Sequence, residues 1–277
     1  MKIQHTFLMA MMGLSLSFSA CNRGAKTADT ALSAVTDTLA PTSAENVADS
    51  IDIRLTDGAG LDSAHVRFLL PCYADKHLNA AILEQISEEL GGSYQGSYDD
   101  AEAMARHYLS AYMQEMRADR KEFDAEMGFE RNLTVERTYE TDQMVTFNVQ
   151  MYQYTGGAHG GTVCYGLTFR KSDGRRMSMN TLGNQVGDEE WSEMQKEGLM
   201  EYFEVKTDSA LQENLQGVET YMIPQPQYAP YFSERGMEFV YQQYEIACYA
   251  AGLPSYTIPY NRLGKYLNVT GKRLVGK

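Results

Sequence analysis

Apolar residues recur at helical spacing in two segments of the first half of the chain. Between Lys76 and Leu90 they return every three to four residues, and Gly91-Gly92 then supplies a helix stop. The second segment follows Ser97, a candidate N-cap. Its apolar stripe consists of Ala101, Met104, Ala105, Tyr108, Leu109, Tyr112, Met113 and Met116. We predict two helices, preceded by a strand over 64–73, and we interpret the stripe as core rather than as a cofactor site.

The apolar period falls to two residues in the middle of the chain. This alternation predicts strands near 133–139, 145–154 and 163–169. Helical spacing returns over 188–203, where Asp188 is the expected cap, and further strands are predicted at 237–246 and 256–260. Because helices and antiparallel strands are segregated, the pattern favours an α+β fold, an antiparallel sheet with helices packed on one face.

The first twenty residues have the pattern of an export signal. Lys2 precedes an apolar run over 7–18, which is too short to span a membrane comfortably and typical of a signal-peptide core. The run leads into Phe18-Ser19-Ala20-Cys21, which resembles a bacterial lipobox, in which the cysteine thiol is acylated. We predict a lipoprotein signal peptide over 1–20 and lipidation at Cys21. An ordinary signal peptide with an incidental cysteine is the alternative.

Residues 21–60 are rich in Ala, Thr, Ser, Asp and Asn. Such a segment buries too little apolar surface to offset the entropy of ordering it. We predict a flexible, disordered tether that holds a folded body away from a membrane, to which the acyl chains attach it. The predicted location is the bacterial cell envelope. The sequence does not fix the leaflet, and the outer membrane is favoured in a Gram-negative cell.

Charge and cysteine content narrow the function further. The 277 residues include 24 Lys and Arg against 37 Asp and Glu, a formal net charge of −13. An acidic surface repels phosphate backbones, so nucleic-acid binding is disfavoured. An exported protein can form disulfides. Cys72, Cys164 and Cys248 nevertheless lie in apolar or strand-like segments, so we interpret them as small buried residues. Whether any two of them pair is left open.

The most distinctive string is Thr155-Gly156-Gly157-Ala158-His159-Gly160-Gly161, between two predicted strands. Its glycines permit positive φ and close approach of the backbone. It lacks the ending of a phosphate-binding loop, and no other His or Cys stands at metal-ligand spacing, so we expect no cofactor and no metal. A bulged strand connection with a locally hydrogen-bonded His159 is the preferred interpretation. A binding role for Gly156, Gly157, His159 and Gly160 is the alternative.

Three further residues are candidates for a site. Glu245 interrupts an apolar, aromatic segment, and a structural partner such as an arginine is its expected role. Tyr228 and Tyr231 belong to a proline-containing stretch that is typical of a recognition loop. No nucleophile elbow or zinc-protease motif occurs, so we predict no catalytic residue. The rival hypothesis is an envelope hydrolase or peptidoglycan-modifying enzyme that uses His159 and a carboxylate. A His159–Glu245 pair in an open cleft would favour that rival.

Residues 155–160 and 239–252, followed by Ile258-Pro259-Tyr260, resemble the RsiV-like exported proteins. That family pairs a domain of unknown function 4163 with a domain of unknown function 3298. The resemblance covers about 64–270 and implies subdomains over 64–160 and 161–270. Cys248 stands where the family commonly has a proline.

The resemblance implies binding rather than catalysis. The best understood members bind lysozyme, and others accompany a peptidoglycan deacetylase domain. The expected partners are therefore a lysozyme-like protein or a peptidoglycan fragment, besides the membrane itself. Direct inhibition of lysozyme is a further alternative.

Overall fold

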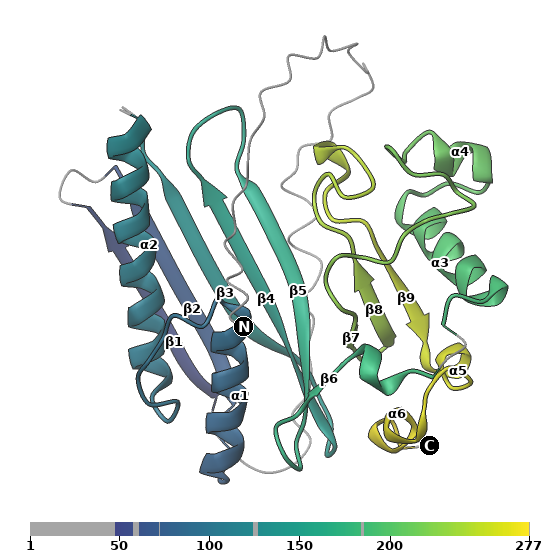
Figure 1. Cartoon of the computed structure of the whole chain (residues 1–277), viewed down its shortest axis with the longest axis horizontal. Coiled ribbons are helices and arrows are strands. Elements are labelled where there is room, and N and C mark those ends of the chain that lie inside the picture. The colour runs from purple at the N-terminus through teal and green to yellow at the C-terminus, as the bar shows by residue number, and fades with distance from the viewer. Residues whose placement is uncertain (1–47, 58–60, 72, 124–126, 184–185, 277) are drawn as a thin grey trace, which may run out of the picture. The chain divides into compact units, whose positions relative to one another are not determined.

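The computed structural model describes residues 48–57, 61–71, 73–123, 127–183 and 186–276 (Figure 1). All of them belong to one compact unit, Asn46–Lys277. The predicted signal peptide, Cys21 and Cys72 lie outside the described residues. No helix within the described ranges has both the length and the apolar character needed to cross a bilayer.

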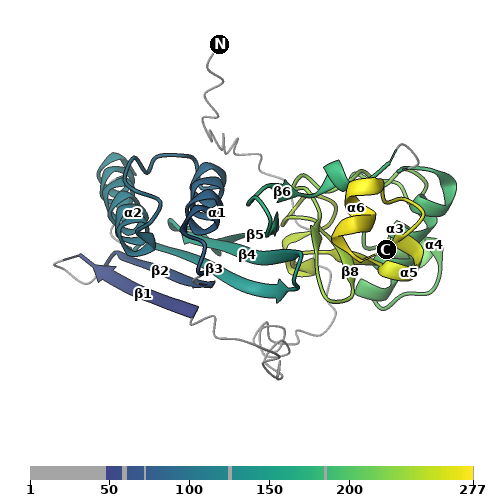
Figure 2. The same ribbon diagram turned by 90° about the horizontal axis from the view of Figure 1, so that it is seen from below.

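Six strands form the larger sheet, in the order β1-β2-β3-β4-β5-β6. They are β1 (Ala48–Thr56), β2 (Ser63–Pro71), β3 (Glu130–Glu140), β4 (Met144–Tyr154), β5 (Gly161–Arg170) and β6 (Arg176–Met177). Helices α1 (Lys76–Glu89) and α2 (Ala101–Phe123) lie on the same face of this sheet (Figure 2). The predicted α+β class is confirmed. One pair departs from the expected antiparallel order: β2 and β3 are parallel, because α1 and α2 form a crossover between them.

The predicted tether extends too far, because residues 48–56 form β1. This strand pairs with β2 from Ala48↔Pro71 to Thr56↔Ser63. Ile51 and Ile53 are half-buried against the core, whereas Asp52 between them is exposed. An edge strand that buries one face needs few apolar residues. The polar composition of 21–60 therefore concealed the alternation at the end of that segment.

The C-terminal part contains a smaller, antiparallel sheet with several short helices. Its strands are β7 (Tyr231–Phe232), β8 (Gly236–Val240) and β9 (Ser255–Pro259). Its helices are α3 (Glu189–Tyr202), α4 (Asp208–Gln212), α5 (Tyr260–Leu263) and α6 (Val269–Leu274), with the 3-10 turns η1 (Met179–Thr181) and η2 (Tyr249–Ala251). The strand predicted over 237–246 ends at Val240 instead. Tyr244 has a φ of 67°, which no strand residue adopts, and a turn follows.

Helix caps decide where two of the helices begin. Asp188 caps α3 as predicted, since its carboxylate accepts from the Trp191 N–H at 2.7 Å. Helix α2 begins later than the sequence suggested. Asp100, rather than Ser97, accepts from the Ala103 N–H at 2.8 Å.

Two apolar clusters form the core. The first lies between the larger sheet and its two helices and contains Phe68, Tyr108 and Phe147, so the predicted α2 stripe is largely buried. The second surrounds Trp191 and Phe239. The subdomain boundary expected between residues 160 and 161 falls between β4 and β5, which pair along their length. Strand β5 therefore belongs to the same sheet as the preceding strands.

Candidate binding site on the open sheet face

The face of the larger sheet opposite α1 and α2 is lined mainly by polar side chains. On β2, Ala64, Val66 and Phe68 are buried in the core, so the intervening residues point to the opposite face. The strand register extends that face in rows. One row is Arg54, His65, Asn132, Tyr152 and Thr162, and the next is Asp52, Arg67, Thr134, Gln150 and Cys164. We call this surface the open face.

An aromatic cluster stands beside the open face, near the turn from β4 to β5. The ring of His159 stacks on that of Tyr249, with centroids 3.7 Å apart and planes 19° from parallel. Its Nε2 lies 3.1 Å from the hydroxyl of Tyr244. His159 and Tyr244 are exposed and Tyr249 is half-buried. We call these three residues the aromatic triad.

Tyr152 connects the aromatic triad with the open face. Its ring covers Gly160 so closely that a Cβ atom there would overlap it. Burial raises the pKa of Tyr152, and the neighbouring Glu130 and Tyr249 raise it further. The phenol is therefore neutral at physiological pH and can donate as well as accept a hydrogen bond.

The glycine string forms the tight connection that its sequence predicted. Gly156 and Gly157 have φ values of 96° and 90°, so the expected positive φ is confirmed there. The Tyr154 hydroxyl donates to the carbonyl of Gly157 at 3.1 Å. His159 makes the expected local contact, with Nδ1 3.0 Å from the carbonyl oxygen of Gly160. Within the described ranges no three His, Cys, Asp or Glu side chains are close enough to share a metal ion.

Glu245 braces a turn. Its carboxylate oxygens accept the backbone N–H groups of Gln227, at 2.6 Å, and Gln242, at 2.7 Å. The expected arginine partner is thus replaced by two peptide groups. Across the described part of the chain, no hydrogen bond or ion pair joins Glu245 to His159. These two residues therefore do not form the pair that the hydrolase hypothesis requires.

Tyr228 and Tyr231 pack against β5 and are not displayed on a free loop. Tyr228 stacks on Tyr165 with centroids 4.5 Å apart, and the Tyr231 ring lies directly over Gly166. Burial raises the pKa of both phenols. Tyr221, which precedes this stretch, is 82% exposed.

Two glutamines that sequence reasoning missed attach the turn containing Tyr244 to β5. The Gln242 amide accepts from the Cys164 N–H at 3.0 Å and donates to the Cys164 carbonyl at 2.9 Å. Gln243 accepts from the Thr162 N–H at 2.9 Å. Side-chain amides thus continue the hydrogen-bond ladder at the β5 edge. The adjacent pair of glutamines is the only sequence signal, and it resembles ordinary surface composition.

The cysteine interpretation holds for one of the two described residues. Cys164 is half-buried, with Sγ 3.3 Å from Asn148 Oδ1, and burial raises the pKa of its thiol. Cys248 is exposed, so its predicted burial was wrong. The chain has already left the strand at Val240, and Cys248 stands at the start of η2. Both thiols are free.

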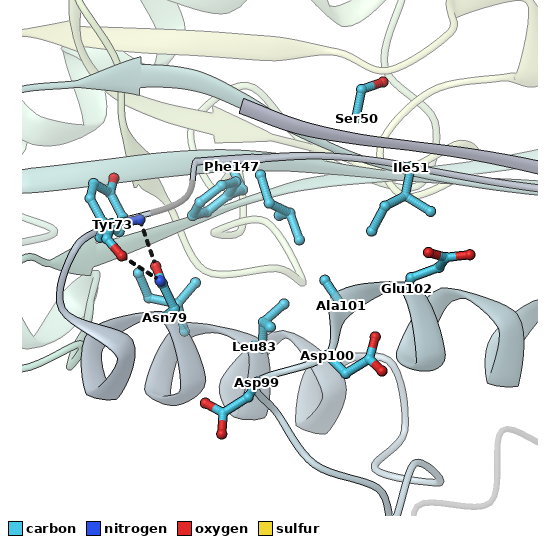
Figure 3. A pocket seen from close by; sticks show the side chains of 12 residues that line it. Ser50, Ile51, Tyr73, Asn79, Leu83, Asp99, Asp100, Ala101, Glu102 and Phe147 are labelled. Carbon is cyan, nitrogen blue, oxygen red and sulfur yellow. Dashed lines mark hydrogen bonds between the residues drawn. The ribbon is translucent and has the colours of Figure 1, made fainter. Parts of the chain in front are cut away.

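A cavity of about 560 Å³ lies on the helix-covered side of the sheet (Figure 3). It is lined by Ser50, Ile51, Leu70, Tyr73, Asn79, Ile82, Leu83, Asp99, Asp100, Ala101, Glu102 and Phe147. Several of its polar groups already have partners. Asn79 bonds the backbone of Tyr73, Asp100 caps α2, and Glu102 pairs with Arg106. A ligand would find few converging polar groups here, so we place the candidate site at the aromatic triad.

The fold and the open face define an α+β protein with an exposed aromatic and polar surface. Residues 70–162 match the family model described as Deacetylase PdaC, and residues 180–261 match the model Protein of unknown function (DUF3298). The chain therefore contains a PdaC-like domain followed by a DUF3298 domain. The 3298-type part of the resemblance is confirmed, whereas the 4163-type part is not. A search of curated proteins found no match.

Two crystal structures of DUF3298 family proteins share the fold. The Bacteroides fragilis protein is 21% identical with a TM-score of 0.69, and the match covers 83% of this chain and 98% of that one. The Pseudomonas aeruginosa protein is 16% identical with a TM-score of 0.59, covering 82% and 96%. At these identities the likeness shows the fold alone. The two domain matches suggest a cell-envelope-associated protein of unknown function.

Proposed function

We propose that this chain is a non-catalytic glycan-binding module of the bacterial cell envelope, anchored to a membrane through acyl chains on Cys21. The observation that carries the proposal is the aromatic triad beside the open face. Aromatic rings offer a flat apolar surface to the C–H face of a sugar. Amides and hydroxyls arranged around them can bond its hydroxyl groups. Peptidoglycan supplies both kinds of contact.

The aromatic triad is held in place before any ligand arrives. Tyr244 occupies the left-handed region, where a non-glycine residue costs of order 1–3 kcal/mol. Glu245 braces the turn on one side, and Gln242 and Gln243 hold it on β5. A strained backbone of this kind persists only where the surrounding structure holds it in place. A fixed aromatic surface loses little entropy on binding.

Neutral hydrogen-bonding side chains lie next to the aromatic triad and suit a glycan. In the nearest row of the open face these are Asn132, Tyr152 and Thr162. The charged Arg54 stands at the far end of that row, and Glu130 lies near Tyr152. The formal charge of −13 would draw a lysozyme-like protein towards the molecule. That attraction is generic and does not depend on the aromatic triad. Binding of a lysozyme-like protein is therefore the alternative outcome of the test.

The test is co-sedimentation of the purified protein with insoluble peptidoglycan. Tyr249→Ala removes the ring on which His159 stacks, so we expect affinity to fall about tenfold or more, which corresponds to about 1.4 kcal/mol. Tyr221→Ala is the matched control. It deletes another tyrosine ring, 82% exposed and outside the aromatic triad, and should leave binding unchanged.

Four results would contradict the proposal. The wild-type protein could fail to sediment with peptidoglycan, or both tyrosine variants could bind equally well. Release of soluble fragments from peptidoglycan would show turnover and support the hydrolase alternative. Saturable binding of lysozyme without binding of glycan would indicate that the partner is a lysozyme-like protein rather than a glycan. Melting temperatures of both variants should match that of the wild type, so that loss of binding is not loss of fold.

A further inference from the structure

Strand β1 presents a long, regular edge. It pairs with β2 through nine consecutive residue pairs without a register shift, and in the described ranges no strand pairs with its other side. The other strands that end a sheet are short: β6 and β7 have 2 residues each and β9 has 5. The edge of a strand carries N–H and C=O groups that can pair with another strand.

Several of the usual protections against such pairing are absent from the middle of β1, where Asp52 and Arg54 are the charged residues. Residues 50–56 contain no Lys, Pro or Gly, and no bulge interrupts the strand. Leu55 remains 41% exposed at its apolar face. A further strand placed alongside would cover part of that face.

The residue types of β1 are arranged symmetrically about Ile53: a charged residue stands on each side of it, then an apolar residue, then a hydroxyl residue. In an antiparallel pair of two β1 strands centred on Ile53, Asp52 of one copy stands opposite Arg54 of the other. Ile51 then stands opposite Leu55, and Ser50 opposite Thr56. We propose that β1 pairs in this register with β1 of a second copy of the chain. The two sheets then join into one across a twofold axis.

Other registers are less favourable. If the register shifts by one residue, the apolar side chains of one strand stand opposite the polar side chains of the other. Centring the pair on Asp52 places two aspartates opposite each other, and centring it on Arg54 places two arginines opposite each other. Like charges directly opposite are destabilising in a sheet, whereas opposite charges stabilise it. Over residues 50–56 the Ile53 register satisfies both requirements, and its one like-charged pair, Asp49 with Asp57, falls past the end of the strand at Thr56. A second copy is therefore a better match than an unrelated peptide.

The oligomeric state of the purified full chain tests this proposal. Sedimentation velocity over a range of concentrations should show a species of twice 31.1 kDa. Arg54→Glu places a glutamate opposite Asp52 at two symmetric positions, so we expect the dimer dissociation constant to rise tenfold or more. Arg273→Glu makes the same charge change on α6 and should leave the dissociation constant unchanged.

Cross-linking tests the register itself. Ser50→Cys protein is mixed with Thr56→Cys protein, oxidised mildly and analysed by peptide mass spectrometry. A disulfide between positions 50 and 56 of different copies is expected. Ser50→Cys protein alone, which keeps the Asp52–Arg54 pairs, should give much less of a cross-link between the two copies of position 50. A monomer at all concentrations would overturn the proposal. A dimer unaffected by Arg54→Glu, or cross-linked only at other positions, would overturn it as well.

Discussion

At the residue scale, a buried ion pair ties three separate parts of the chain together. Asp62 is fully buried and accepts from Arg120 Nε at 3.0 Å and from the Phe129 N–H at 3.0 Å. It thereby joins the start of β2 to the end of α2 and the approach to β3. Sequence patterns do not reveal these contacts, because Arg120 and Phe129 lie 58 and 67 residues beyond Asp62, and Asp62 follows a polar segment.

Replacing Asp62 with asparagine should be strongly destabilising. Burial alone would raise the pKa of Asp62, but the hydrogen bonds from Arg120 and Phe129 outweigh it, and the pKa lies below its ordinary value. Removing one partner of a buried pair typically costs about 3–5 kcal/mol. Urea denaturation at pH 7 should show a loss of this size for Asp62→Asn. Asp142→Asn, at an exposed residue between β3 and β4, should change stability by less than about 0.5 kcal/mol.

The pH dependence of the same variant follows from the lowered pKa. The stability from ionised Asp62 is complete above the ordinary carboxyl pKa of about 3.9 and is lost as pH falls through the lower, folded-state value. The difference in the free energy of unfolding between wild type and Asp62→Asn should therefore become smaller below about pH 4. A difference that stayed constant down to pH 2 would contradict the assignment.

At the element scale, the prediction was accurate where one face of an element is continuously apolar. The α2 stripe and the cap of α3 were both anticipated. Strand β1 was missed because an edge strand needs only a few apolar residues. The strand predicted over 237–246 was too long, because the turn at Tyr244 depends on hydrogen bonds from backbone groups to Glu245, which sequence patterns do not reveal.

Two glycines of β5 provide a matched test of how the smaller sheet packs on the larger. A Cβ atom at Gly166 would overlap the ring of Tyr231, whereas one at Gly161 meets nothing within 4 Å. Overpacking typically costs about 1–3 kcal/mol. Thermal denaturation should show Gly166→Ala losing stability by this amount and Gly161→Ala staying within about 0.5 kcal/mol of wild type. Equal effects of the two substitutions would contradict the close packing of Tyr231 on β5.

At the scale of the whole molecule, the sequence predicted the α+β class and named His159 as a candidate site residue, but not the tyrosines that meet it. Its separate candidates, His159 and Glu245, do not meet. His159 instead meets Tyr244, which lies 85 residues further along the chain. Only the folded chain brings the glycine string to the turn after β8. The parallel β2–β3 pair likewise depends on how α1 and α2 cross the sheet, which apolar periodicity does not specify.

Binding of a glycan by the aromatic triad can be tested by an NMR titration of the protein with soluble peptidoglycan fragments. The ring resonances of His159, Tyr244 and Tyr249 are assigned by comparison with their alanine variants. We expect saturable shifts at these three rings and at Tyr152, and no shift at the residues that line the cavity on the helix-covered side of the sheet. Shifts confined to that cavity, or no saturable shift at any ring, would contradict it.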